Sequence, residues 1–309
     1  MMHYLEQCVC RHRPDLAGAM TLTPIPTGKF NDSFYVDAGG EQLVLRIAPP
    51  DDAVFCFYER RMMRQEPGLH NLLHARTTAP VPRILAFDDS RDIIDRDFLL
   101  MKRMPGVPLT ECAGADINAI LREAGACLAQ VHALTADAYG YLGEHAPMEP
   151  QPSWAEAFAV MWQLLAEDVA QQGYYTHTEL NAMIDLFARH RHRFNRHVPA
   201  SLLHMDIWAQ NLLVEGGRLT GILDWDRALW GDPEIEFAVL DYCGVSLPPF
   251  WQGYGGTRDN SHDAQIRRQF YLLYEIQKYI VIRHGRNHNP AAACRYKEQV
   301  QQLTRAIPG

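Results

Sequence analysis

The chain has 309 residues and a formal net charge of −8 at pH 7, and its estimated pI is near 5.9. Its composition, with 47% hydrophobic and 21% charged residues, is that of a folded protein, and its length favours two lobes of about 100 and about 200 residues. The acidic balance argues against a nucleic-acid partner, which requires a basic surface. No apolar run approaches the roughly 20 residues of a membrane span, so we expect no membrane partner.

Seven cysteines are scattered along the chain without paired spacing, and the first residues show no basic-then-apolar signal segment. Both features predict reduced thiols in a cytoplasmic protein. A metal site at Cys8 and Cys10 is an alternative, but no second Cys or His pair follows at zinc-finger spacing. The sequence does not indicate an oligomeric state.

The first 104 residues are predicted to form a sheet with few helices. Residues 1 to 20 show a loosely helical pattern that Pro14 interrupts, which predicts a short helix and a linker. An irregular apolar stripe predicts a second helix over residues 57 to 76. Alternating apolar residues, with a turn at Gly39 and Gly40, predict strands at 20–26, 34–36, 42–47, 84–87 and 98–101.

The segment from Lys102 to Gly106 follows the last of these strands and marks the predicted boundary between a lobe of residues 1–104 and a lobe of residues 105–309. Helix 116–135 has the clearest apolar periodicity, and His132 near its C-terminal end is predicted to be an exposed residue that the helix dipole favours. Further helices are expected at 153–172 and 178–198. The basic cluster within the latter is predicted to be a solvated face.

The stretch from Ser201 to Val239 holds three short apolar runs, separated by polar breaks, that predict buried strands. Asp206, Asn211 and Asp224 stand at the ends of these runs. Two carboxylates with an amide carbonyl form an oxygen donor set that suits Mg²⁺. Downstream, we expect a helix from Glu234, a loop over 248–260, and helices over 263–284 and 291–307.

The spacing of these polar residues matches a kinase catalytic loop. His204, Asp206 and Asn211 fit the frame H-x-D-x-x-x-x-N, and Leu223-Asp224-Trp225 falls where D-F-G would. In that frame Asp206 accepts the proton of the acceptor hydroxyl, while Asn211 and Asp224 hold the metal. A β-hairpin with capping aspartates is the alternative interpretation, and the joint spacing of all three residues argues against it.

The segments His204–Asn211 and Leu223–Pro233 resemble the aminoglycoside phosphotransferase and choline kinase-like family of small-molecule kinases. The resemblance covers about residues 20 to 245. One departure is Met205, which replaces the usual glycine and introduces a larger side chain close to where an acceptor approaches. Ile207-Trp208 is also similar to the D-L-W of fructosamine kinases, which keeps that branch as an alternative.

This resemblance implies an α+β protein kinase-like bilobal fold, with an antiparallel N-lobe sheet, one N-lobe helix and a larger, mainly helical C-lobe. Arg46 stands where kinases carry the lysine that contacts the ATP phosphates, and a glutamate, Glu66 or alternatively Glu59, pairs with it. Ser33 belongs to the loop, from Thr27 onward, that covers the phosphates. Lys102 and Met104 occupy the hinge positions whose main-chain groups bind adenine.

The family also suggests roles for residues around the site. Asp232 is expected to brace the catalytic loop, and Asp226 to assist the metal loop or cap it. Specificity lies in the part of the chain that is least recognisable. Candidates for acceptor contact there are Trp251, Tyr254, Asp241 and Glu275, each with core or surface packing as the alternative.

The expected function is phosphorylation of a hydroxyl on a small molecule with ATP and Mg²⁺, and the favoured acceptor is an aminoglycoside-type antibiotic. The alternatives are a metabolic sugar, amine or ketosamine kinase and a non-catalytic ATP-binding scaffold. The intact set of Asp206, Asn211 and Asp224 counts against a scaffold. Since Gly231-Asp232-Pro233 follows Asp224 closely, no activation loop fits, and a small acceptor is favoured over a protein. The choice between ATP and GTP stays open.

Overall fold

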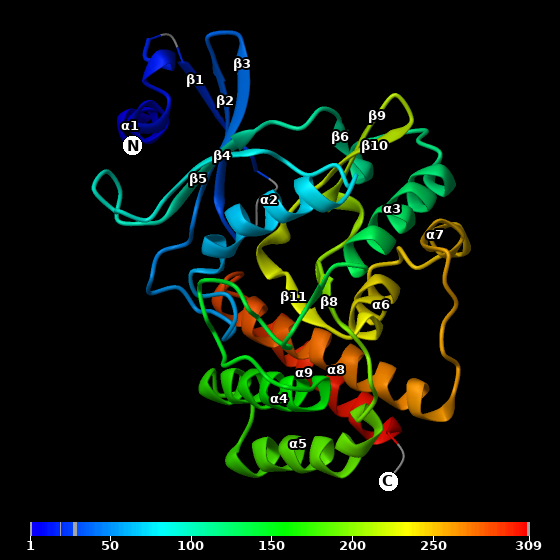
Figure 1. Ribbon diagram of the computed structural model, residues 1–309. Coiled ribbons are helices and arrows are strands. Elements are labelled where there is room, and N and C mark those ends of the chain that lie inside the picture. The colour runs from blue at the N-terminus through cyan, green and yellow to red at the C-terminus, as the bar shows by residue number, and fades with distance from the viewer. Residues whose placement is uncertain (1, 19, 27–29, 308–309) are drawn as a thin grey trace.

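The computed structural model describes residues 2–18, 20–26 and 30–307, and the chain folds into a small sheet lobe above a larger helical lobe (Figure 1). The small lobe contains a five-stranded antiparallel sheet in the order β1-β2-β3-β5-β4. The predicted α+β two-lobed fold is confirmed. The strands are β1 (Met20–Pro24), β2 (Asp32–Ala38), β3 (Glu41–Ile47), β4 (Ile84–Asp88) and β5 (Phe98–Lys102).

Two helices accompany this sheet, α1 (Met2–His12) and α2 (Glu66–Arg76). Helix α1 is the predicted leading helix and buries Leu5, Cys8 and Val9 in the same apolar cluster as strands β2, β3 and β5. Burial raises the pKa of the Cys8 thiol to about 11. Within the described ranges, no three His, Cys, Asp or Glu side chains gather as a metal site.

Helix α2 begins at Glu66, so the prediction of a helix from residue 57 is wrong over its first part. Arg61 has φ 58°, a left-handed conformation that breaks a helix, and a 3₁₀ turn (Met62–Gln65) follows. Pro67 then occupies the first turn of α2, where its missing N–H has no helical partner to lose. The chain therefore uses Pro67 to start the helix.

The large lobe is built from α3 to α9 and two small antiparallel sheets, β10-β9-β6 and β11-β8-β7. Its strands are β6 (Val107–Pro108), β7 (Thr135–Ala136), β8 (Ala200–Leu203), β9 (Leu212–Glu215), β10 (Arg218–Ile222) and β11 (Leu229–Gly231). Its helices are α3 (Ile117–His132), α4 (Trp154–Gln171), α5 (His177–His190), α6 (Pro233–Tyr242), α7 (Pro248–Tyr254), α8 (His262–Gly285) and α9 (Pro290–Ala306). None of the described helices is long and apolar enough to cross a bilayer.

Two predictions for this lobe are corrected. Residues 248–254 form helix α7 instead of a loop, with Gly255 at φ 73° as its C-terminal cap. Gly253 lets α7 pack tightly on α3, because a Cβ there would lie 1.8 Å from the Arg122 carbonyl oxygen. The helix predicted to reach residue 198 ends at His190, and this side chain is buried against Phe270 instead of facing solvent.

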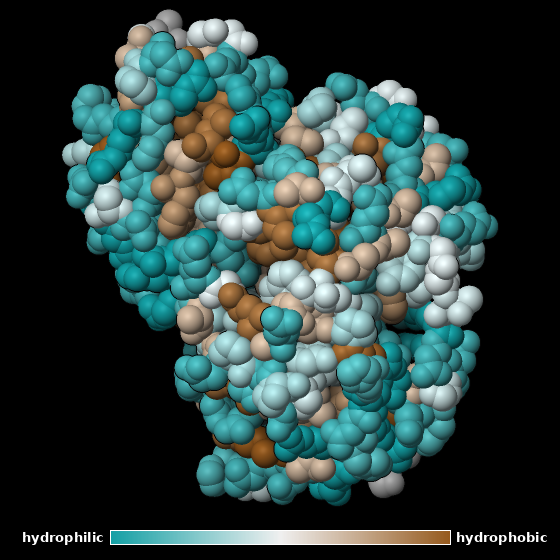
Figure 2. Space-filling view, viewed as in Figure 1, coloured by the Kyte–Doolittle hydropathy of each residue, from teal (hydrophilic) through white to brown (hydrophobic). Residues whose placement is uncertain are grey.

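The two lobes are joined by the segment between β5, which ends at Lys102, and β6, which begins at Val107. Strand β6 pairs with β9 of the large lobe. In the space-filling view of Figure 2, brown apolar residues gather on the small lobe and at its junction with the large lobe, while most of the remaining surface on that face is hydrophilic. The predicted catalytic and metal loops, on either side of β9 and β10, belong to the large lobe.

Candidate active site

The structure brings the predicted catalytic and metal loops together. Asp206 and Asn211 lie on the loop between β8 and β9, where the Asn211 side-chain N–H₂ donates to the Asp206 carbonyl oxygen at 2.9 Å and to its Oδ2 at 3.2 Å. The Leu223 amide, directly before Asp224, donates to the Asn211 carbonyl oxygen at 2.9 Å. Three polar residues at the ends of separate apolar runs thus share one site.

His204 locks these two loops together through its ring. Nε2 donates to the Leu223 carbonyl oxygen at 2.8 Å, and Nδ1 accepts the Asp206 amide at 3.1 Å. This pairing requires a neutral ring protonated at Nε2. Complete burial lowers the pKa of His204, against the opposing effect of Glu236. The ring therefore holds the backbone of Asp206 at a fixed distance from the backbone of Leu223, which directly precedes Asp224.

Glu236 on α6 contacts the predicted catalytic loop, and the sequence interpretation missed it. It is fully buried and accepts the backbone amides of His204 at 3.0 Å and Met205 at 2.7 Å, and His132 donates to it from Nε2 at 2.8 Å. Burial opposes ionisation, but these donors outweigh it and lower the pKa of Glu236. An acidic residue on the otherwise apolar face of α6 was the only available signal.

His132 was predicted to be exposed, and this is wrong: it is 6% exposed. Besides Glu236, the ring contacts the Tyr254 hydroxyl at 2.9 Å through Nδ1. The role of bracing the catalytic loop, which the family implied for Asp232, is filled here by Glu236. Asp232 instead caps α6 by accepting the Glu234 amide at 3.0 Å and lies 3.4 Å from Arg196.

Met205 adopts φ 68°, a left-handed conformation in which glycine is unstrained. The strain of about 1–2 kcal/mol is offset by contacts on both sides of the residue, because Glu236 accepts its amide and Arg227 donates to its carbonyl oxygen at 2.6 Å. The side chain is fully buried in the large-lobe core. Met205 therefore does not narrow the surface that an acceptor approaches.

Asp206 lies beside a buried charge network. Its Oδ1 is 3.9 Å from Lys278 Nζ, Lys278 contacts Glu275 at 2.5 Å, and Glu275 contacts Arg227 at 2.9 Å. Burial raises the pKa of Asp206, and Lys278 and Arg227 oppose that rise. Glu275 was a candidate for acceptor contact; the structure instead buries it between two cations. Lys278 was not identified from the sequence.

Arg46 on β3 joins the small lobe to the metal loop. Its guanidinium donates to Glu66 at 2.6 Å and to Asp226 at 3.0 Å, and it lies 3.4 Å from Asp224. Burial disfavours the cation, but the three carboxylates outweigh it and raise the pKa of Arg46. The structure thus selects Glu66 as the partner of Arg46, while Glu59 pairs with Arg286 at 2.5 Å.

The charge state of the Arg46–Glu66 pair follows from its geometry. Burial raises the pKa of Glu66, whereas a guanidinium in direct contact favours the carboxylate and cannot itself be deprotonated in proteins. At this separation of 2.6 Å the ionised form of Glu66 is favoured over the neutral form, because a neutral Glu66 would leave the buried cation poorly compensated. Ser33 lies opposite Arg46 in the register of β2 and β3, which places it beside this pair.

The remaining predicted positions are less connected to the site. The Lys102 amide already donates to the Arg83 carbonyl oxygen at 2.9 Å, and its side chain pairs with Glu41. Met104 lies just beyond this strand end, half-buried, between the lobes. The predicted phosphate-covering loop includes Thr27 to Lys29, which lie outside the described residues.

Three residues proposed for acceptor contact pack elsewhere in the large lobe. Trp251 donates to Ser246, Tyr254 contacts His132, and Asp241 pairs with Arg258 at 2.6 Å. The rings of Trp251 and Tyr254 both pack against Phe237. These contacts give the three residues structural roles on α6 and α7.

The donors at the metal loop fit a hard cation. The Asp224 carboxylate is 46% exposed, and its one ion pair within the described part of the chain is the 3.4 Å contact with Arg46. Burial raises the pKa of Asp224 to about 6, with Arg46 opposing and Asp226 adding to the rise. Since the Asn211 side-chain N–H₂ group donates to Asp206, the Oδ1 of the same amide is left to bind a cation. An oxygen-only donor set of this kind suits Mg²⁺.

Comparison with known proteins places this site in context. A family model described as "Phosphotransferase enzyme family" matches residues 21–296. The probable ketoamine kinase of Vibrio cholerae is 29% identical over 179 residues, which are 55% of this chain and 55% of that protein. The probable ketoamine kinase YniA of Escherichia coli is 30% identical over 247 residues, covering 75% of this chain and 79% of the relative.

Among solved structures, the chain is similar to the aminoglycoside phosphotransferase APH(4)-Ia in a ternary complex with AMP-PNP and hygromycin B. The TM-score is 0.69 at 18% identity, and 99% of each chain is covered. At this identity the likeness concerns the fold, and it confirms the predicted kinase-like architecture. The chain spans about half the length of the Vibrio relative that it matches.

Proposed function

Because the chain belongs to the phosphotransferase enzyme family, whose model spans residues 21–296, we propose that it transfers the γ-phosphoryl group of ATP to a hydroxyl of a small molecule. The observation that carries this proposal is the convergence of Asp206, Asn211 and Asp224 beside the Arg46–Glu66 ion pair. These are the groups that phosphoryl transfer requires for positioning and charge stabilisation.

In the proposed reaction the acceptor oxygen forms a bond to the γ-phosphorus while the bond from that phosphorus to the bridging oxygen breaks, so that ADP leaves. The proton of the acceptor hydroxyl passes to the Asp206 carboxylate. The raised pKa of Asp206 makes it a stronger base than an exposed aspartate. Lys278, 3.9 Å from Asp206 Oδ1, opposes that rise in the pKa.

The remaining residues orient the nucleotide. Asn211 and Asp224 would hold Mg²⁺, which when bound neutralises phosphate charge. Arg46, fixed by Glu66, offers its guanidinium to the phosphates, and Ser33 on the neighbouring strand contributes a hydroxyl donor. The Met104 amide is the proposed adenine contact, since the Lys102 amide is used within the small lobe.

The relatives support two acceptor classes. Four probable ketoamine kinases are among the relatives that match by sequence, which supports the ketosamine alternative, and the structural likeness to a hygromycin B complex supports the aminoglycoside class. The third possibility, a scaffold that binds ATP without catalysis, does not need a hydrogen-bonded Asp206 and Asn211. The proposal is therefore a small-molecule kinase.

A coupled ADP-release assay with Mg²⁺-ATP tests this function. The acceptor panels are ketoamines, aminoglycosides, sugars and amines, and Asp206→Asn is compared with the native chain. We expect acceptor-dependent ADP release that falls about 10³-fold or more in the variant. The same rate in both proteins would refute the assignment of Asp206.

A further inference from the structure

An open cavity of about 430 Å³ lies on the large lobe where the end of α6 meets α8 and the start of α9. Its aromatic and polar lining consists of Tyr242, Arg283, Asn289, Arg295, Tyr296 and Gln299. No carboxylate is among its described lining residues. The volume is in the range of small-molecule sites.

This cavity is linked to Asp206 through two neighbouring residues of α8. Lys278 Nζ lies 3.9 Å from Asp206 Oδ1 and 4.9 Å from the centre of the Tyr279 ring. Tyr279 in turn stacks on Tyr296 at 5.1 Å and lies 5.7 Å from Tyr242, and both of these rings line the cavity. The proximity of Asp206 also contributes, after burial and Glu275, to raising the pKa of Tyr279.

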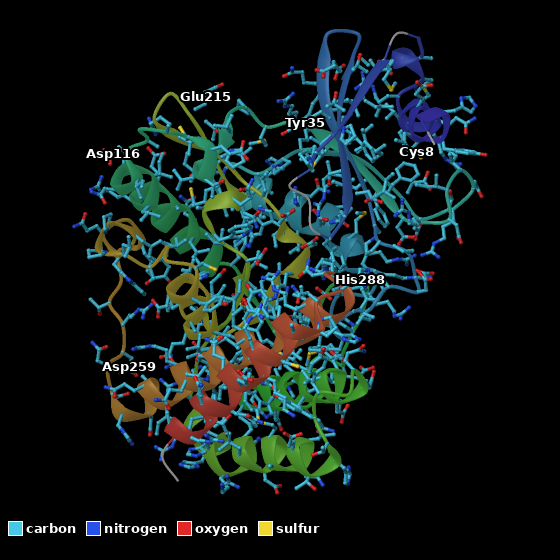
Figure 3. All side chains as sticks on the ribbon, turned by 180° about the vertical axis from the view of Figure 1, so that it is seen from behind. Cys8, Tyr35, Asp116, Glu215, Asp259 and His288 are labelled. Atoms are coloured by element: carbon cyan, nitrogen blue, oxygen red, sulfur yellow. The ribbon has the colours of Figure 1, made fainter. Side chains whose placement is uncertain are left out.

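The end of α8 also reaches the junction of the lobes. Arg286 pairs with Glu59 of the small lobe, and its guanidinium lies 4.5 Å from the centre of the Phe30 ring. In Figure 3, the turn that carries His288, between α8 and α9, lies where the two lobes meet. The cavity is therefore lined by the same helix, α8, that contacts Asp206 through Lys278 and the small lobe through its C-terminal end.

The charge of the cavity is opposite to that of the whole chain, which is −8. Arg283 lies 5.7 and 5.8 Å from the centres of the Tyr279 and Tyr296 rings, donates from Nη1 to Asn287 and also hydrogen-bonds the Tyr296 side chain. Arg295 is exposed and makes no ion pair with any residue of the described ranges. Two guanidinium groups thus face one cavity without a compensating carboxylate.

Nearby acidic groups do not cancel this charge. Glu275 is buried between Lys278 and Arg227. Asp241, one residue before Tyr242, is held by Arg258. A ligand in the cavity would therefore meet cations and aromatic faces.

Building on the phosphotransferase function proposed above, we propose that this cavity binds the acceptor, and that the acceptor is a hydroxylated compound with an anionic group, a carboxylate or a phosphate. Guanidinium groups pair with both anions through parallel N–H donors. The faces of Tyr242 and Tyr296 would pack on the body of the acceptor. Like-charge repulsion disfavours a polycationic aminoglycoside in the same cavity.

Matched probes test this acceptor class. Gluconate, glucose 6-phosphate, glucose and glucosamine share a hydroxylated body but differ in charge, and hygromycin B serves as a polycation. Binding is measured by thermal shift of the full chain, and turnover by ADP release with Mg²⁺-ATP. The variants are Arg283→Gln, Arg295→Gln and the charge-preserving Arg283→Lys, and the control is Arg305→Gln, an exposed arginine of α9 outside the cavity.

We expect the anionic probes to bind more tightly than glucose or glucosamine, and each Gln variant to weaken that binding about 10-fold or more. Arg283→Lys should restore part of the loss, and Arg305→Gln should match the native chain. A preference for gluconate over glucose 6-phosphate, or the reverse, identifies the anion. The proposal is overturned if neither anion binds in an arginine-dependent way, or if glucosamine or hygromycin B binds best.

These outcomes are separable from failure of the proposed function. If Asp206→Asn leaves ADP release unchanged while the anions still bind through Arg283 and Arg295, the catalytic assignment fails and the cavity assignment stands. If Asp206→Asn abolishes turnover of a cationic acceptor that the arginine variants do not affect, the kinase function stands and the anionic-acceptor proposal fails.

Discussion

Replacing Glu236 by glutamine should weaken both the fold and the catalytic loop, although the two side chains have nearly the same shape. The carboxylate accepts three hydrogen bonds, from the amides of His204 and Met205 and from His132. The glutamine N–H₂ group must replace one of the two oxygens. His132 can adapt by changing tautomer, so that its Nε2 accepts a hydrogen bond from the glutamine N–H₂ group, but a backbone amide can only donate.

At least one buried loop amide therefore loses its acceptor in Glu236→Gln, at a cost of about 1–3 kcal/mol. The bonds that remain lose their ionic character, and charge-assisted hydrogen bonds are roughly twice as strong as neutral ones. We expect the free energy of unfolding to fall by about 2–4 kcal/mol, which corresponds to a drop in Tm of roughly 3–6 °C for a chain of this length.

Thermal unfolding followed by circular dichroism measures this effect. The control is Glu298→Gln, an exposed glutamate on α9, which should change stability by less than about 0.5 kcal/mol. We also expect kcat to fall more than the KM for ATP rises in Glu236→Gln, because the loop carries Asp206 and Asn211 but not the nucleotide contacts of the small lobe. Native-like Tm and kcat in Glu236→Gln would refute the bracing role.

The stability difference should also depend on pH. The folded-state pKa of Glu236 lies below its ordinary value of 4.5, so its contribution is fully present above the unfolded-state pKa and is lost as pH falls through the folded-state pKa. The gap in Tm between the native chain and Glu236→Gln should therefore narrow below about pH 4.3. A constant gap down to pH 3 would mean that the carboxylate charge does not matter.

Three further changes have distinct readouts. Lys278→Met removes a cation that lowers the pKa of Asp206, so the acidic limb of the kcat/KM profile should move to higher pH. Met205→Gly relieves a strained φ but empties a buried site, and thermal melts should show a net loss of about 2–4 kcal/mol. Arg46→Lys keeps a charge but cannot bridge Glu66 and Asp226 as a fork, and ADP-release kinetics should show a raised KM for ATP, by about 10-fold.

Each of these three predictions has a result that would contradict it. Lys297→Met, whose ammonium pairs with Glu179 on the helical lobe, should leave the pH profile unchanged, and an unshifted profile in Lys278→Met would contradict the electrostatic role. A more stable Met205→Gly would mean that strain exceeds packing there. An unchanged KM for ATP in Arg46→Lys would argue that the guanidinium does not contact phosphates.

The sequence by itself determined the catalytic and metal loops, because their signal is local. Asp206 and Asn211 are five residues apart on one loop, so the spacing of residue types already carries the geometry. The strands of the small lobe were predictable for the same reason, since each alternates apolar residues between recognisable turns. Helix α2 was misplaced because Arg61 adopts a left-handed φ that residue type alone does not indicate.

Only the tertiary structure decided what surrounds Asp206. Glu236 joins His132, 104 positions earlier, to the catalytic loop, and Lys278 reaches Asp206 from another helix. Apolar periodicity tells which face of a helix is buried, but it does not distinguish a buried carboxylate with partners from a solvated one. The cavity of Arg283 and Arg295 likewise exists only where three helices meet. The candidate catalytic residues can therefore be recognised from their short spacings in the sequence. The contacts that brace the loop and the charge of the proposed acceptor site depend on long-range packing.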